Sequence, residues 1–434
     1  MDQQDLQKCH STVTKEVTLN QDQENALDSV LDFLEKPKEK FMIIQGSAGT
    51  GKSTLIKYIA RALEAQYQMY SLLLQKAPDK EKFEVALSAT TNKAVSVLKE
   101  LTNMDAVTIH SLLDLKVAPN YTTGETDLIK KPDYSVKWNK LVIVDEASMI
   151  SDELFGFLDR TLKDSKIILI GDQYQLAPVK QEVSIMESMT CRKVSMNKIM
   201  RHAGEILHTS AQFRESVETG IFKNIPVGVA VNLVNGPTFQ KLIDAAFTAP
   251  DYNRDSAKIL CWKNERVLEY NKHVRKIKGY PENFGEGEIV QTNNPILAKT
   301  EMIPVDSLLT ITGMSNLHNQ KSIPGYTVEL NDSIRAFMPQ SDQQRKQLLK
   351  TYAGEKAWQK FYGIKTNWLD LRASYASTVH KSQGSSYKTV FIDLQDIGEC
   401  FIPSDVARML YVSISRAVKQ VYLYGQLPPR YRGA

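Results

Sequence analysis

The feature that most constrains the fold is a glycine-rich run after the first apolar stretch, Gly46-Ser47-Ala48-Gly49-Thr50-Gly51-Lys52-Ser53-Thr54. Residues 41–44 predict a short buried strand before this run, and residues 54–65 predict a helix after it. The pattern is typical of a phosphate-binding loop, because its glycines let successive backbone N–H groups wrap around phosphate oxygens. Lys52 is expected to contact the β- and γ-phosphates, and the Ser53 hydroxyl to hold Mg²⁺. A plain glycine-rich turn is the alternative, but the order of strand, loop and helix favours a site for ATP and Mg²⁺.

An acidic pair supplies the second half of the predicted site. Residues 141–144 predict another buried strand, and Asp145 and Glu146 follow it directly. Such a strand end can place one carboxylate beside the metal and the other beside the attacking water. Asp145 is therefore the expected Mg²⁺ ligand and Glu146 the expected general base. Gln175 follows the strand predicted at residues 167–170 and could contact the γ-phosphate, although a polar turn is the alternative interpretation there.

The order of predicted elements indicates several domains. A chain of 434 residues is too long for one ordinary core and fits two or three domains. Residues 1–192 alternate strands and amphipathic helices, as α/β domains do. A second α/β rhythm runs through residues 193–278 and 371–434, so the β-rich residues 279–370 are predicted to be an insertion. Residues 114–137 are interrupted by proline and glycine and predict a β-hairpin or irregular excursion.

Apolar periodicity predicts the individual elements. Helices are expected at residues 20–34, 264–276 and 406–417, and further central strands at residues 85–88, 259–262, 390–394 and 421–424. The insertion is expected to hold antiparallel strands at residues 289–291, 308–312, 326–330 and 334–338, followed by a polar helical stretch at residues 340–361.

Composition restricts the class of protein more than its activity. Apolar residues make up 42% and charged residues 24%, as in soluble globular proteins. The formal net charge of +4 permits a nucleic-acid partner without requiring one. We expect a reduced intracellular protein without structural zinc, because no metal-ligand spacing links its four cysteines, Cys9, Cys191, Cys261 and Cys400. No signal peptide and no run of about 18 apolar residues is present, so no membrane partner is expected.

The motifs as a set resemble those of superfamily-one DNA helicases of the RecD-like branch, and most closely those of the Dda-like helicases of T-even phages. The resemblance runs from about residue 19 to residue 425, with the motifs in the family's order. It implies two RecA-like P-loop domains with parallel sheets flanked by helices. The first is expected at residues 1–192, with the β-hairpin as a strand-separating pin. The second is expected at residues 193–278 and 371–434, and residues 279–370 would form an SH3-like β insertion that carries a helical arm.

The same resemblance assigns further nucleotide contacts. Gln23 matches the glutamine that reads adenine, and Gln383 and Gly384 lie in another matched motif. Arg201 and Arg416 become the arginine fingers of a cleft between the two RecA-like domains. An arginine supplied across such a cleft would stabilise the charge on the transferring phosphoryl group.

Candidate DNA contacts also come from the resemblance, which matches residues 88–94, 108–111 and 377–384 to strand-contacting motifs. Their hydroxyl and imidazole groups suit phosphate oxygens and carry little information about base identity, so sequence-independent binding is expected. Taken singly, each side chain is more simply explained as a helix cap or a loop hydroxyl. The expected DNA contacts are Thr90, Thr91, Asn92, Lys93, Thr108, His110, Thr378, His380 and Lys381.

Direction of movement is predicted from the residues after Gln175. Helicases of the opposite polarity carry an aromatic residue shortly after this glutamine, whereas here the sequence continues Leu176-Ala177-Pro178-Val179. This departure is similar to the RecD and Dda branch and implies movement from 5′ to 3′.

The pin has two candidate tips. Leu128 and Ile129 could form an apolar wedge, which can replace part of the base stacking lost at a fork. The family pin carries an aromatic residue that is missing there, and Tyr121 is the nearest substitute. In the family the arm braces the pin. The aromatic residues of the arm, which could dock it or simply pack locally, are Trp358, Phe361, Tyr362 and Trp368.

The favoured function is an ATP-driven DNA helicase that moves on single-stranded DNA and unwinds the duplex at a fork. An RNA helicase or a translocase that displaces bound proteins is the alternative, because phosphate contacts serve either backbone. A non-catalytic binding module is disfavoured, since none of the catalytic side chains is missing. The family implies a monomer that works with replication or recombination proteins in the cytoplasm of a bacterial or phage-infected cell.

Overall fold

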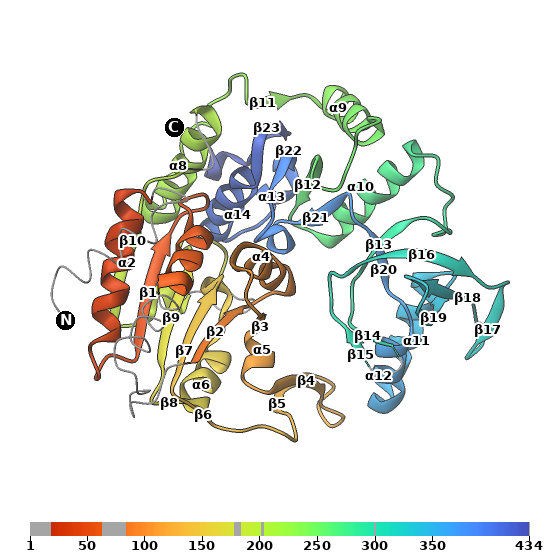
Figure 1. Ribbon diagram of the computed structural model, residues 1–434. Helices are drawn as coiled ribbons and strands as arrows, with labels where there is room; N and C mark the ends of the chain where they lie inside the picture. Colours follow the sequence, from red (N-terminus) through yellow and green to blue (C-terminus); the bar gives the residue numbers. More distant parts are fainter. Residues whose placement is uncertain (1–18, 63–83, 178–183, 201–203, 299–300, 434) are drawn as a thin grey trace. The chain divides into compact units, whose positions relative to one another are not determined.

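The computed structural model describes residues 19–62, 84–177, 184–200, 204–298 and 301–433 (Figure 1). The chain divides into two compact units. The first comprises Met1–Lys116 and Lys130–Ile221, and the second Val117–Ile129 and Phe222–Ala434. Each unit contains its own parallel sheet flanked by helices, so the predicted α/β class is confirmed. None of the described helices is long and apolar enough to cross a membrane.

The first unit is built on a six-stranded parallel sheet with the order β10-β1-β9-β7-β2-β3. Its strands are β1 (Phe41–Gly46), β2 (Glu84–Ala89), β3 (Ala106–Thr108), β7 (Lys140–Asp145), β9 (Lys166–Gly171) and β10 (Arg192–Met196). Nearly all side chains of β1, β7 and β9 are buried, as in strands covered on both faces. Because the strands are parallel, their carboxyl ends meet at one edge, where sheets of this kind bind ligands.

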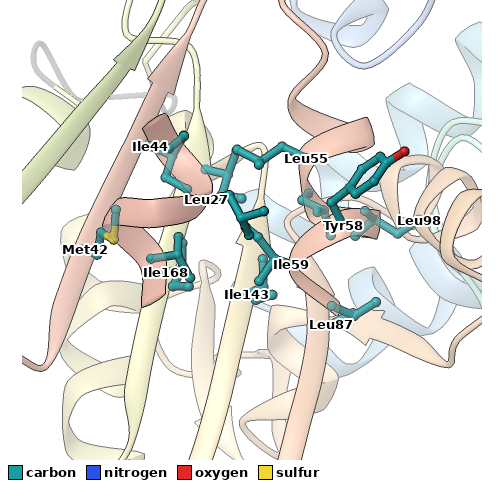
Figure 2. Close-up of a cluster of buried hydrophobic side chains, with 14 of the residues drawn as sticks. Leu27, Met42, Ile44, Leu55, Tyr58, Ile59, Leu87, Leu98, Ile143 and Ile168 are labelled. Atoms are coloured by element: carbon teal, nitrogen blue, oxygen red, sulfur yellow. The ribbon is translucent and has the colours of Figure 1, made fainter. Parts of the chain in front are cut away.

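Helices bury the apolar faces of this sheet. The first, α2 (Gln21–Leu34), starts at a capping box formed by Asn20 and Gln23. Another helix starts at residue 52 and is described to residue 62. Figure 2 shows Leu27, Leu55 and Ile59 from these two helices in one cluster with strand residues such as Ile143. The other elements are α4 (Asn92–Thr102), α5 (Ile109–Leu112), η1 (Ala147–Met149), α6 (Asp152–Thr161), α7 (Ile185–Ser188), α8 (Gly204–Thr219) and the paired strands β6 (Lys137–Trp138) and β8 (Leu162–Lys163).

The first unit extends beyond the boundary predicted after residue 192. Strand β10 pairs with β1, with Met42 opposite Arg192 and Gly46 opposite Met196, and α8 also belongs to this unit. The predicted boundary is therefore wrong. The physical reason is that strand pairing is non-local, so the residues of β10 do not reveal which sheet the strand joins.

The second unit is built on a five-stranded parallel sheet with the order β11-β23-β22-β12-β21. The strands are β11 (Val231–Val234), β12 (Ala257–Cys261), β21 (Ala376–Thr378), β22 (Tyr387–Asp393) and β23 (Ala417–Tyr424). Aromatic rings fill its core, where the ring centres of Phe239 and Phe247 lie 5.7 and 6.3 Å from the ring centre of Phe391. The helices are α9 (Gly236–Thr248), α10 (Asn264–Ile277), α13 (Leu394–Gly398) and α14 (Pro403–Ser415), with short turns η2 (His380–Ser382) and η3 (Pro429–Tyr431).

An antiparallel sheet lies between α10 and β21 in the order of the second unit, and its last strand falls just past the insertion predicted at residues 279–370. Its order is β17-β18-β16-β13-β20, and β19 also pairs with β18. Its strands are β13 (Ile289–Thr292), β16 (Leu308–Met314), β17 (His318–Gln320), β18 (Ile323–Leu330), β19 (Ile334–Pro339) and β20 (Leu371–Ala373), and a separate pair is β14 (Ile296–Ala298) with β15 (Glu301–Ile303). The SH3-like character of this insertion stays a prediction.

The arm contains two helices where one helical stretch was predicted. They are α11 (Asp342–Gly354) and α12 (Trp358–Asn367). Lys356 between them has a φ of 53°, which a right-handed helix cannot accommodate. Trp368 lies just past α12, and its ring centre is 4.8 Å from that of Phe337, so it belongs to the local core.

Strands β4 (Leu115–Pro119) and β5 (Thr126–Lys130) form a two-stranded hairpin within residues 114–137, where the sequence predicts a β-hairpin or an irregular excursion. Its turn is closed by bonds from the Asn120 N–H to the Glu125 carbonyl (2.8 Å) and from the Gly124 N–H to the Asn120 carbonyl (2.9 Å). Leu128 and Ile129 lie within β5, so they do not form the tip of the hairpin as predicted. The reason is that the turn-forming residues 120–125 place the reversal of the chain before them.

The turn of the hairpin docks on α12. The Tyr362 hydroxyl lies 2.9 and 2.7 Å from the carbonyl oxygens of Gly124 and Glu125, and the ring of Tyr121 meets that of Tyr362 edge to face. Trp358 covers Gly124 so closely that a Cβ there would lie 2.2 Å from the indole. Two of the four arm aromatics therefore contact the hairpin directly.

Candidate nucleotide site and nucleic-acid contacts

The glycine-rich run joins the end of β1 to the helix that starts at Lys52. The Lys52 ammonium donates to the carbonyl oxygens of Gly46 (2.7 Å) and Ser47 (3.1 Å). The Thr50 hydroxyl also donates to the Ser47 carbonyl (2.9 Å). Gly51 has a φ of 84°, in the left-handed region, and a Cβ there would lie 2.4 Å from the Gln23 amide nitrogen. The loop therefore has the backbone conformation and the close packing that require glycine.

Gln23 holds this loop from the side. Its amide nitrogen donates to the Gly51 carbonyl (3.3 Å), while its amide oxygen accepts from the Asn20 N–H (3.0 Å). The side chain is buried. Its position against the loop fits a nucleotide-site residue, and the contact to adenine stays a prediction.

The acidic pair stands at the end of β7. Asp145 is buried, and its carboxylate accepts from the Glu146 N–H (2.8 Å). Burial and, second, the charge of Glu146 raise the pKa of Asp145 to about 7, whereas the charge of Lys52 opposes this shift. Glu146 itself has a φ of 53°, and its buried Oε2 atom has no hydrogen-bond partner among the described residues.

These observations fit a divalent cation. A buried carboxyl group beside a second carboxylate with one buried, unpartnered oxygen is stabilised when a hard cation or its water is present. Asp145 and Ser53 are the residues that would hold Mg²⁺. Within the described part of the chain, no group of three or more His, Cys, Asp or Glu side chains forms another metal site.

The turn after β9 brings Gln175 to the same sheet edge. The Tyr174 N–H donates to the Asp172 carboxylate (3.0 Å) and the Gln175 N–H to the Asp172 carbonyl (3.2 Å). Gln175 and Leu176 are buried. The backbone of Gln175 is thus held in a closed turn, and the residue is not exposed to solvent.

Of the two predicted arginine fingers, only Arg416 is among the residues that the structure describes. Arg201 lies outside the described residues, as do Pro178 and Val179. Arg416, at the end of α14, is buried and donates to the carbonyls of Val412 and Ser385 and to the Ser415 hydroxyl, at 3.2–3.3 Å. In the same unit Gln383 is buried and Gly384 has a φ of 69°. Their roles toward the nucleotide stay predictions.

The predicted DNA contacts of the first unit follow the strand ends. Thr91 and Thr108 cap α4 and α5, accepting from the N–H groups of Ala94 and Ser111 at 3.2 Å. The simpler interpretation as helix caps is therefore correct for both, although a cap can also face DNA. The Thr90 hydroxyl donates to the Glu146 carbonyl (3.3 Å), which links this segment to the acidic pair. Exposed side chains in the segment are those of Asn92 and Lys93.

Both predicted contact histidines are partly buried. Burial lowers the pKa of His110. Burial also lowers the pKa of His380, and the charge of Asp405 opposes that shift. Since both values lie below the ordinary value for histidine, both imidazoles are mainly neutral at pH 7. They can donate one hydrogen bond to a phosphate oxygen without adding a full charge.

The second unit carries the remaining contact segment. Thr378 ends β21, and its hydroxyl accepts from the Lys381 N–H (3.4 Å). The Lys381 ammonium is engaged with Asp306 at 2.8 Å, a contact that sequence did not suggest. Any phosphate contact of Lys381 must therefore compete with this partly exposed ion pair.

Sequence reasoning also missed Arg214 of α8, which lies beside the P-loop. Arg214 donates to the Ser47 hydroxyl (3.3 Å). No motif marks Arg214, and the misplaced domain boundary assigned α8 to the other domain. Only the pairing of β10 could have indicated its true surroundings.

Comparisons with known proteins agree with this geometry. Residues 18–222 match the model of the AAA domain, and residues 373–424 match the UvrD-like helicase C-terminal domain. The ATP-dependent DNA helicase dda of Enterobacteria phage T4 is 24% identical over 93% of this chain and 98% of its own length. The RecBCD enzyme subunit RecD of Buchnera aphidicola is 24% identical over 88% of this chain and 70% of its own length.

The chain is a superfamily-one helicase. Among solved structures, Pif1 helicase from Bacteroides in complex with ADP-AlF3 and ssDNA is similar in fold to this helicase, with a TM-score of 0.51 and 14% identity over 94% of each chain. Pif1 helicase from Candida albicans has a TM-score of 0.50 and 17% identity over 96% of this chain and 97% of its own. The match to the C-terminal model includes the Thr378–Gly384 segment and Arg416 of the helicase.

Proposed function

We propose that this ATP-dependent DNA helicase moves from 5′ to 3′ along single-stranded DNA and separates the duplex at a fork. The observation that carries the proposal is the buried edge at which Lys52, Asp145 and Glu146 meet. There the Lys52 charge acts on Asp145, and the Thr90 hydroxyl bonds the carbonyl of Glu146. A residue of the predicted DNA-contact segment therefore touches the residue proposed to activate water.

The side chains divide the hydrolysis between them. The N–H groups of the loop and Lys52 bind the phosphates of ATP, and Ser53 with Asp145 holds Mg²⁺, which neutralises phosphate charge when bound. Glu146 accepts a proton from the attacking water, because its Oε2 atom is buried and has no partner among the described residues. Gln175 senses the γ-phosphate, and Arg201 and Arg416 stabilise the charge that develops on it.

Binding of single-stranded DNA rests on backbone contacts. Hydroxyls and neutral imidazoles from both units donate to phosphate oxygens, so binding is independent of base sequence and weakens with salt. The hairpin β4–β5, supported by α12, acts as the strand-separating element. We further propose that one chain suffices, since a single copy carries every motif of the site, and that replication or recombination proteins are its partners.

Direction is tested with duplexes that carry one single-stranded tail. The helicase is expected to unwind the 5′-tailed duplex and to leave the 3′-tailed and blunt duplexes intact. Leu176 after Gln175, in place of an aromatic residue, supports this direction. Unwinding of the 3′-tailed duplex alone would overturn it. An ATP-turnover assay that compares stimulation by single-stranded RNA with stimulation by single-stranded DNA distinguishes an RNA helicase from a DNA helicase.

A further inference from the structure

Helix α8 touches the phosphate-binding loop directly. Arg214, in the middle of α8, donates from its Nη1 atom to the Ser47 hydroxyl at 3.3 Å. Ser47 is the second residue of the loop and is only 4% exposed. The loop is thus held by a side chain from an element that follows it by more than 150 residues in the sequence.

The same guanidinium also touches the turn that carries Gln175. Its central carbon lies 5.6 Å from the centre of the Tyr174 ring. The Tyr174 hydroxyl donates to the Glu218 carboxylate at 2.5 Å. Glu218 stands four residues after Arg214 on α8, so both side chains project from one face of the helix. Two side chains of one helix therefore contact Tyr174, Arg214 at the ring and Glu218 at the hydroxyl.

Arg214 and Glu218 each contact a neighbouring segment rather than each other. Among the described residues, no carboxylate forms an ion pair with Arg214, although Glu218 is its helical neighbour. Glu218 instead receives the hydroxyl of Tyr174. A planar guanidinium can donate to the Ser47 hydroxyl and lie on an aromatic ring at the same time, which a lysine ammonium does less well.

We propose that Arg214, Tyr174 and Glu218 form a clamp that sets the distance between the phosphate-binding loop and the turn of Gln175. Arg214 is then a positioning residue for ATP hydrolysis, an inference that rests on the proposed function. Gln175 follows Tyr174 directly, so displacement of the ring displaces the γ-phosphate sensor. A misplacement of about 1 Å in such a site can lower the rate about a hundredfold.

The test measures kcat and KM for ATP with saturating single-stranded DNA. Arg214→Ala is expected to lower kcat about tenfold or more while KM changes by less than about threefold, because positioning acts on the reacting state more than on ATP binding. Arg214→Lys, which keeps a donor for Ser47, is expected to recover part of the loss. Tyr174→Phe keeps the ring and loses the bond to Glu218, so its kcat should fall by a smaller factor of about three.

Two comparisons separate positioning from simple damage to the fold. The double change Arg214→Ala with Tyr174→Ala should lower kcat no further than Arg214→Ala alone, because residues of one clamp do not act independently. His208→Ala, on an exposed position of the same helix, is the matched control and should retain wild-type turnover. Thermal melting identifies any variant that has lost its fold, and the conservative Arg214→Lys and Tyr174→Phe then decide the matter.

Two outcomes would overturn the clamp. If wild-type protein hydrolyses ATP with DNA stimulation and Arg214→Ala has an unchanged kcat, the clamp alone is wrong. Additive losses in the double variant would also exclude it. If wild-type protein shows no DNA-stimulated turnover, the proposed function fails and the clamp fails with it.

Discussion

At the scale of single residues, the positions of Lys52 and the acidic pair suit the roles proposed for them. The Lys52 ammonium rests on two carbonyl oxygens of its own loop, close enough to Asp145 for its charge to oppose the rise of that carboxyl pKa. These two bonds fix the ammonium beside the loop that is proposed to bind phosphate. Preorganised charge of this kind is the main source of rate enhancement in phosphoryl transfer.

Lys52→Ala is expected to lower the rate of ATP turnover by about a hundredfold or more, since it removes the positive charge proposed to contact the phosphates. Binding of single-stranded DNA at low salt should persist. Turnover is measured by phosphate release and binding by fluorescence anisotropy. Lys99→Ala removes the same charge from a half-exposed position and should behave as wild type. Substantial hydrolysis by Lys52→Ala would refute the site.

At the scale of elements, the hairpin is held by α12 rather than by its own two strands. A two-stranded hairpin is marginal by itself, so its direction in space depends on the support it receives. Here that support consists of the Tyr362 hydroxyl on two turn carbonyls and of Trp358 packed against Gly124. The side chain that docks the turn therefore belongs to the insertion.

Tyr362→Phe is expected to lower the rate of duplex unwinding by about threefold or more, with a smaller effect on DNA-stimulated ATP turnover, because one docking hydrogen bond is lost. Tyr352→Phe on α11 removes a hydroxyl without a bond to the hairpin and serves as the control. Leu128→Ala with Ile129→Ala should show the same separation of unwinding from turnover if β5 forms the wedge. Equal losses of both activities would argue against a strand-separating hairpin.

The base of the arm is held by a buried ion pair. Arg345 of α11 lies 2.9 Å from Asp370, with side chains that are only 4% and 10% exposed. The Asp370 carboxylate also accepts from the amides of Asn293 and Asn294 at 2.8 Å. These bonds join α11 to the residues beside β13 and β20 and so fix the arm on the antiparallel sheet.

Asp370→Ala should destabilise the second unit by about 3 kcal/mol, because it leaves Arg345 buried with only the half-exposed Asp342 as partner. The measurement is thermal denaturation of the full chain, together with the rate at which protease cleaves the arm. Asp251→Ala, at an exposed turn of the same unit, is the control. An unchanged melting curve and cleavage rate would show that the pair does not anchor the arm.

At the scale of the whole molecule, each unit presents its motif residues at the carboxyl ends of parallel strands. In the first unit Asp145 ends β7, and the phosphate-binding loop follows β1. In the second, Thr378 ends β21. This repeated placement follows from parallel strands, whose carboxyl ends share an edge where loops converge. Two units of this kind are the expected basis of a motor that alternates its grip on one strand.

Local elements could be predicted well from sequence. Residues 20–34 were predicted as a helix and form α2 with Asn20 as its cap, and the strand predicted at residues 141–144 lies inside β7. Periodicity and capping residues are local signals, so they indicate where an element starts and ends. The hairpin tip and the interrupted arm helix were missed because they depend on Asn120 and Lys356 adopting particular turn conformations.

The sequence by itself determined the chemistry: a phosphate-binding loop, an acidic pair and the order of motifs that identifies a superfamily-one helicase. Those features lie in short runs of residues whose spacing carries the mechanism. Only the tertiary structure decided that β10 joins the first sheet, that α8 lies against Ser47 and Tyr174, and that the hairpin docks on Tyr362. Contacts of this kind join residues tens to hundreds of positions apart, and they are selected by packing and pairing across the fold, which no local pattern encodes.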